Sequence, residues 1–183
     1  MFRRIMRQGQ QGNQLNAEQM ALLVNANQVL TAGKPAEAAP LFTQLAVELE
    51  KQQHPRRAAN VYARAAHAFA DAQNETAALA QARKALTLFL QYRMVQRSPV
   101  FFANILRKMK AHNMNNAASA IQKEYGGQIG VAPVESQAAP SARRGVLPTQ
   151  CPKCGAPVGA DVNWVDERTA ECDYCGTLLR AGN

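Results

Sequence analysis

All four cysteines of this 183-residue chain fall close to its C-terminal end, as two Cys-x-x-Cys pairs. Cys151 and Cys154 form the first pair, and Cys172 and Cys175 form the second, with residues 155–171 between them. Two close pairs of thiolates, brought together by a fold, supply four ligands to a tetrahedral metal ion about 2.3 Å from each sulfur. The spacing therefore predicts a four-thiolate metal site in this part of the chain.

Both pairs end in a Cys-Gly dipeptide, Cys154-Gly155 and Cys175-Gly176. Glycine reaches the positive φ that turns backbone amides toward the sulfurs. Between and after the pairs, residues 162–165, 169–172 and 177–179 have the composition of short strands. The pattern resembles the zinc ribbon family, and the resemblance implies a small antiparallel sheet between two metal-binding turns.

A structural Zn²⁺ is the cofactor that we expect here, held by the four cysteines. The segment has too little apolar surface to fold unaided, whereas a structural zinc supplies roughly 10 to 16 kcal/mol of apparent binding free energy. With four protein ligands, no coordination position remains for water or substrate.

Three alternatives to zinc stay open. Paired disulfides suit a secreted protein, but the N-terminus lacks the apolar core of a signal peptide. A rubredoxin-like iron site uses the same four-thiolate geometry. A redox-active dithiol, in a thiol-redox or metal-delivery protein, would require labile cysteines.

Residues 17–125 alternate apolar-periodic segments with short breakers, which predicts six helices. We expect Asn16 to cap the first helix together with Gln19, and Ser98 to cap the fifth. Gly126 should end the last helix in a left-handed conformation. The breakers lie at residues 33–35, 54–55, 73–74, 98–99, 113–116 and 126–127.

An internal repeat runs through this helical region. Alanine pairs recur at nearly equal spacing, at Ala38-Ala39, Ala77-Ala78 and Ala117-Ala118. Small and apolar residues around the first two pairs resemble the tetratricopeptide repeat. The period of that repeat, about 34 residues, is shorter than the spacing between successive alanine pairs. The small and apolar residues are Leu22, Ala26, Val29, Gly33, Ala38 and Phe42, then Tyr62, Ala66, Phe69, Ala78, Ala82 and Ala85.

The resemblance implies a mainly α fold of about three antiparallel helical hairpins, followed by a linker and a small C-terminal β zinc ribbon. The longer period indicates longer helices than the family has. Such an array forms a concave groove that binds a segment of another protein. A closed bundle held by the alanine stripe is the alternative architecture.

The net charge of +8 is unevenly distributed along the chain. Residues 151–183 carry three basic and five acidic residues, whereas residues 17–125 carry 13 basic and seven acidic residues. A ribbon that binds nucleic acid needs cations against the phosphates, so this ribbon is expected to face protein or simply to cap the chain. The candidate partner-binding cations on the helices are Arg57, Arg64, Arg83, Lys84, Arg107 and Lys108.

The predicted domain order is a basic N-terminal tail (1–16), the helical repeat domain (17–125), an extended linker (126–150) rich in Gly, Ala, Pro and Ser, and the zinc ribbon (151–183). The tail offers too little apolar area for firm membrane contact, so we interpret it as a frayed basic tail or a docking segment. Its candidate residues are Phe2, Arg3, Arg4, Ile5 and Arg7.

Catalytic motifs and a small-molecule substrate site are not evident, and His54, His67 and His112 are isolated. We therefore expect a cytoplasmic, non-enzymatic adaptor or scaffold. It would bind a protein partner, such as a multi-subunit complex, through the helices and make a second contact with the ribbon. The alternative is nucleic-acid binding through the basic helical face and the arginine-rich N-terminus.

Overall fold

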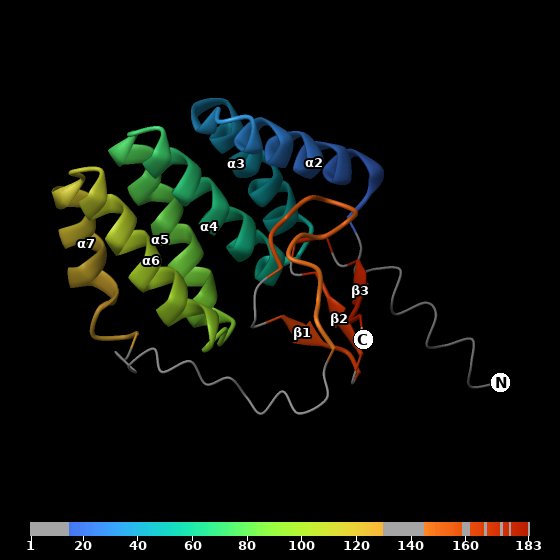
Figure 1. Cartoon of the computed structure of the whole chain (residues 1–183). Coiled ribbons are helices and arrows are strands. Elements are labelled where there is room, and N and C mark those ends of the chain that lie inside the picture. The colour runs from blue at the N-terminus through green and yellow to red at the C-terminus, as the bar shows by residue number, and fades with distance from the viewer. Residues whose placement is uncertain are drawn as a thin grey trace.

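The structure, a computed structural model, describes residues 15–129, 145–158, 162–166, 168–172, 174–175 and 177–182. This part of the chain contains six helices and a three-stranded sheet, which confirms the mainly helical class with a small C-terminal sheet (Figure 1). The expected docking residues of the tail and most of the linker lie outside the described residues. The helices are α2 (Ala17–Thr31), α3 (Pro35–Lys51), α4 (Pro55–Asp71), α5 (Glu75–Gln91), α6 (Arg97–Ala111) and α7 (Asn115–Tyr125).

Helices α2 to α6 all end in the same turn. Just beyond each helix, one residue has a φ between 51° and 77°. Its N–H donates to the carbonyl three residues back, and the next N–H donates to the carbonyl five residues back. These two hydrogen bonds satisfy carbonyls that a helix end otherwise leaves open. The left-handed residues recur every 20 positions, at Gly33, Gln53, Gln73, Arg93 and Asn113.

A small buried residue recurs with the same 20-residue step, near the start of each helix from α3 to α7. Four of these residues are alanines that are at most 2% exposed, and the fifth is Ser98, at 6%. Small side chains let neighbouring helices approach closely. The repeat is therefore a single helix and its turn. The four alanines are Ala38, Ala58, Ala78 and Ala118.

Two of the three expected helix ends are wrong. The capping box of Asn16 with Gln19 is confirmed. Ser98, however, is buried inside α6, which begins at Arg97 without a side-chain cap, because Ser98 occupies the small-residue position of the repeat. Gly126 has a right-handed conformation, with φ −57° and ψ −35°, because the chain continues α7 into a further turn before the buried Ile129.

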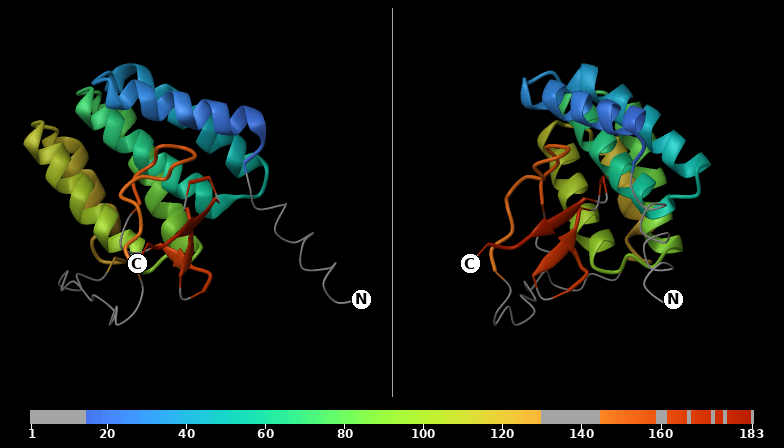
Figure 2. Two further views of the ribbon diagram at one scale, coloured as in Figure 1. Left: turned by 45° about the vertical axis from the view of Figure 1, so that its right-hand side comes forward. Right: turned by 90° about the vertical axis from the view of Figure 1, so that its right-hand side faces the viewer.

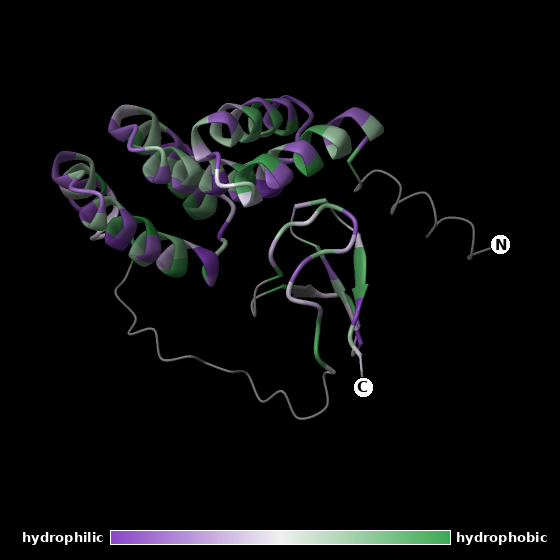
Figure 3. Ribbon diagram, turned by 45° about the horizontal axis from the view of Figure 1, so that its top comes forward, coloured by the Kyte–Doolittle hydropathy of each residue, from purple (hydrophilic) through white to green (hydrophobic). Residues whose placement is uncertain are grey.

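The helices form an open row of antiparallel hairpins. Each helix packs against the next, and α4 also contacts α6 as α5 contacts α7. Helices α2 and α7 lie at opposite ends of the row (Figures 1 and 2). Each helix carries hydrophobic and hydrophilic residues together (Figure 3). None of the helices in the described ranges is long and apolar enough to cross a membrane.

The sheet pairs β1 (Asn163–Trp164), β2 (Thr169–Glu171) and β3 (Leu178–Arg180) in sequence order, with antiparallel neighbours. Ala170 and Leu179 face each other and are buried. Two isolated bridges, Val146 with Gly182 and Gln150 with Pro157, join the end of the expected linker to this module. We call residues 145–182, as far as they are described, the cysteine module.

Candidate metal centre

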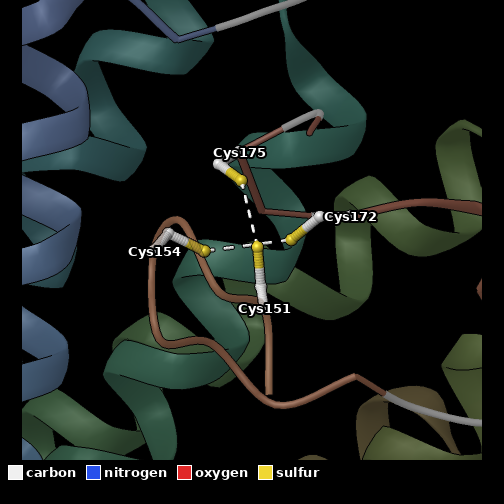
Figure 4. Close-up of side chains that lie close together, drawn as sticks. All are labelled: Cys151, Cys154, Cys172 and Cys175. Atoms are coloured by element: carbon white, nitrogen blue, oxygen red, sulfur yellow. Dashed lines mark hydrogen bonds between the residues drawn. The ribbon is translucent and has the colours of Figure 1, made fainter. Parts of the chain in front are cut away.

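The four cysteines occupy two turns of the cysteine module. Cys151 and Cys154 lie before β1, whereas Cys172 and Cys175 lie between β2 and β3. All four side chains are at most 2% exposed and point toward one another (Figure 4). The fold thus holds Cys151 and Cys175, which are 24 positions apart in the sequence, in direct contact.

The sulfur positions fit a tetrahedral metal ion. All four lie within 4.8 Å of one another, and none is in a disulfide. The Sγ atoms of Cys151 and Cys175 are 3.7 Å apart, and those of Cys154 and Cys172 are 3.9 Å apart. A tetrahedron with metal–sulfur bonds of about 2.3 Å has edges of about 3.8 Å. These four residues are therefore able to hold a metal ion.

Backbone amides turn toward the sulfurs in both turns, and in the first turn this follows the prediction from Cys154-Gly155. Gly155 has a φ of +70°, and the following N–H, of Ala156, donates to the sulfur of Cys154. In the second turn, the N–H groups of Tyr174 and Cys175 donate to the sulfur of Cys172. Such bonds favour the thiolate form and orient each ligand. Gly176 lies outside the described residues.

The thiols perturb one another strongly. Hydrogen bonds to Cys172 and Cys175, with burial, raise the pKa of the Cys154 thiol. Hydrogen bonds from Cys154 and Cys172 hold the pKa of Cys175 far below its usual range. The cluster on its own thus stabilises the thiolate of Cys175 at the expense of those of Cys154 and Cys172. Four thiolates at these distances require a cation between them.

Three side chains fasten the cysteine module to the helices. Asn27 of α2 donates from Nδ2 to the carbonyl oxygen of Cys154. The Nη2 atom of Arg57 lies 2.8 Å from Oε1 of Glu171, and the arginine side chain is only 9% exposed. Arg64 of α4 lies 5.4 Å from the ring centroid of Tyr174. Helices α2 and α4 therefore hold the module directly.

The six candidate partner-binding cations do not form one surface. Arg57 and Arg64 contact the cysteine module, and the other four lie on α5 and α6. Those four have partners on the helices: Arg83 with Glu124, Lys84 with Tyr62, Arg107 with Asn104 and Lys108 with Asp71. Sequence reasoning does not identify Asn27 and Glu171 as fastening residues, because neither belongs to a motif.

Comparison of the chain with protein-family models, with curated proteins and with solved structures found no match. The candidate centre therefore stands on its own geometry. A metal ion held by all four sulfurs would take every ligand from the protein.

Proposed function

We propose that the metal is Zn²⁺ and that its role is structural. The sulfur–sulfur distances of 3.7 and 3.9 Å support a tetrahedral ion, and four thiolates leave no open position for substrate. Metal analysis of the purified chain should find about one zinc per chain, and X-ray absorption should show four sulfur neighbours near about 2.3 Å. Stoichiometric iron with the visible absorption of a ferric tetrathiolate would replace zinc by a rubredoxin-like site.

We further propose that the chain is a non-enzymatic adaptor, with tetratricopeptide-like hairpins that bind protein. The observation that supports this most directly is the contact of α2 and α4 with the cysteine module. Asn27, Arg57 and Arg64 hold that module by a hydrogen bond, a buried ion pair and a cation–π contact. Protein interfaces use the same kinds of contact. The row of helices thus already holds one folded surface, that of the chain's own cysteine module.

The test is purification of the tagged full-length chain from its source cells. We expect one or more proteins to co-purify in near-stoichiometric amount and then to bind the purified chain directly. Each partner should be tested again with the Cys172→Ser and Cys175→Ser chain, which asks whether the metal-bound module makes a second contact. If no protein binds the purified full-length chain directly, the adaptor function is wrong.

Nucleic-acid binding is the second candidate, favoured by the net charge of +8. The pairing of Arg57, Arg83 and Lys108 with carboxylates reduces the positive charge available for phosphates. Binding of labelled RNA or DNA, measured between low and physiological salt, tests this function. A steep loss of affinity with salt would support it, and an absence of binding at low salt would eliminate it.

A further inference from the structure

A cleft of about 610 Å³ lies where the helices meet the cysteine module. Its walls are the α3–α4 turn with the start of α4 (residues 53–57), the α5–α6 turn (residues 92–97), and a module wall that includes Trp164 and Glu171. The volume is within the range of small-molecule sites, about 300 to 1,000 Å³. We call this space the arginine cleft, after the side chains described next.

Four arginines line the cleft: Arg56, Arg57, Arg93 and Arg97. Among the described lining residues, Glu171 is the one carboxylate, and it pairs with Nη2 of Arg57. The Nη1 atom of Arg57 is buried and has no hydrogen-bond partner in the described part of the chain. A buried guanidinium with an unused donor is costly unless a further acceptor satisfies it.

Two helices, α4 and α6, begin at the cleft. No side chain of either helix offsets the partial positive charge at its N-terminus. Neither α4 nor α6 has a side-chain cap or an acidic residue in its first turn. By contrast, α2, α3 and α5 carry a glutamate there, and Glu75 accepts a hydrogen bond from the N–H of Ala117 in α7. Helix N-termini attract anions through free N–H groups and the helix dipole.

Arginines at these helix starts break a local rule of helix stability. A cation at a helix N-terminus is unfavourable, yet Arg56 and Arg57 occupy the first turn of α4, and Arg97 begins α6. Protein contacts hold these guanidinium groups at the cleft: Nη2 of Arg56 donates to the carbonyl oxygen of Tyr92, and Nη1 of Arg97 donates to Oδ1 of Asn60. Guanidinium groups bind phosphate through paired N–H donors. Tyr92 and Trp164 add aromatic surface to the walls.

We propose that the arginine cleft binds a phosphate-bearing small molecule of nucleotide size. The anionic group binds among the arginines and the two helix starts, and the remaining part of the ligand lies toward Tyr92 and Trp164. This site is independent of the adaptor function, because it requires no protein partner.

The experiment is isothermal titration of the metal-loaded full-length chain with pyrophosphate, with ATP and with citrate. We expect saturable binding of the two phosphate compounds and at least about tenfold weaker binding of citrate. Arg93→Gln should weaken phosphate binding by about fivefold or more, since this exposed side chain has no partner in the described ranges. The matched control, Arg107→Gln, removes the same charge from α6 outside the cleft and should leave the affinity unchanged.

Hydrogen exchange adds an independent readout, in which ATP should protect amides of residues 92–97. Because polyphosphates bind Zn²⁺, metal content is measured after each titration and should be unchanged. The proposal is overturned if neither phosphate compound binds at millimolar concentration, or if citrate binds equally well. Equal weakening by Arg93→Gln and Arg107→Gln would also overturn it, because the effect would then be general electrostatics.

Discussion

Asn27 donates a buried hydrogen bond to the main-chain carbonyl oxygen of Cys154, 127 positions further along the chain. The bond joins the first described helix to the first cysteine-bearing turn. It is one of the contacts by which helices α2 and α4 hold the candidate metal centre in place, beside the Arg57–Glu171 pair and the Arg64–Tyr174 contact. The cysteine module and the helical row are thus in direct contact, and their stabilities should be linked.

Replacing Asn27 by alanine tests this link. The substitution leaves the carbonyl of Cys154 buried without its donor, and we expect the free energy of unfolding to fall by about 1 to 3 kcal/mol. Urea denaturation of the metal-loaded chain measures it, and release of metal to a chelator should become faster. Asn25→Ala, at an exposed position of the same helix, should change stability by less than about 0.5 kcal/mol. Equal effects of the two variants would contradict the link.

The Arg57–Glu171 pair should contribute more to the free energy of unfolding than an exposed ion pair does. Arg57→Met removes the ion pair with Glu171 in a mostly buried setting, and we expect the free energy of unfolding to fall by about 3 kcal/mol. A double-mutant cycle with Glu171→Gln should give a coupling above about 1 kcal/mol. The Arg83–Glu124 pair, whose side chains are 42% and 38% exposed, should give less than about 1 kcal/mol. Similar couplings for both pairs would show that burial is not decisive.

Removal of the metal should unfold the cysteine module while most of the helical structure remains. The module has few buried apolar residues of its own, whereas the helices share an extensive core. After chelation, far-UV circular dichroism should retain most of its helical signal. Hydrogen exchange should increase in residues 145–182 and around Asn27 and Arg57, and α5 to α7 should stay protected. Loss of the whole helical signal in one transition would contradict this expectation.

His67 should make stability depend on pH. Burial, followed by the charge of Lys108, lowers the pKa of its imidazole to about 4, and the ring packs edge-on against Phe101. The unfolded chain takes up this proton near pH 6.5. The contribution of neutral His67 to the free energy of unfolding is therefore complete above pH 6.5 and is lost as the pH falls toward 4. Its full size is of the order of 3 kcal/mol.

Comparison with His67→Gln isolates this contribution, because protonation of the cysteines affects both chains alike. The difference in unfolding free energy between the chains should shrink between pH 7.5 and pH 5. Titration of the His67 ring by NMR should give the low pKa directly. A ring that titrates near pH 6.5 would show that it is solvated in the folded state.

The left-handed turns offer a stability test of the 20-residue repeat. Gln73 has a φ of 57°, which a side chain tolerates poorly and glycine adopts freely. We expect Gln73→Gly to raise the unfolding free energy by about 0.5 to 1 kcal/mol. Gly33→Ala should lower it by about 1 kcal/mol from backbone strain alone, since a Cβ there meets no atom within 4 Å. If Gln73→Gly destabilises the chain, the side chain of Gln73 contributes contacts beyond the turn.

Local patterns in the sequence predict much of the fold. Apolar periodicity and breaker residues predict the six helices, and the Cys-x-x-Cys spacing predicts the cysteine cluster. Each of these signals can be read from residues that are close together in the sequence. A serine before a proline predicts a helix cap from the local sequence alone. The cap expected at Ser98 is wrong because the 20-residue repeat places a small buried residue at this position. The Asn27–Cys154 and Arg57–Glu171 contacts have no such signal, since each joins residues more than a hundred positions apart.

The 20-residue step also determines how a chain of this design can change length. Successive helices run in opposite directions, so inserting one unit would reverse the direction of every helix that follows. Inserting two units would restore the direction and add a complete hairpin. The contacts with the cysteine module involve α2 and α4. An added hairpin beyond α5 would therefore lengthen the row without separating the module from the helices that hold it.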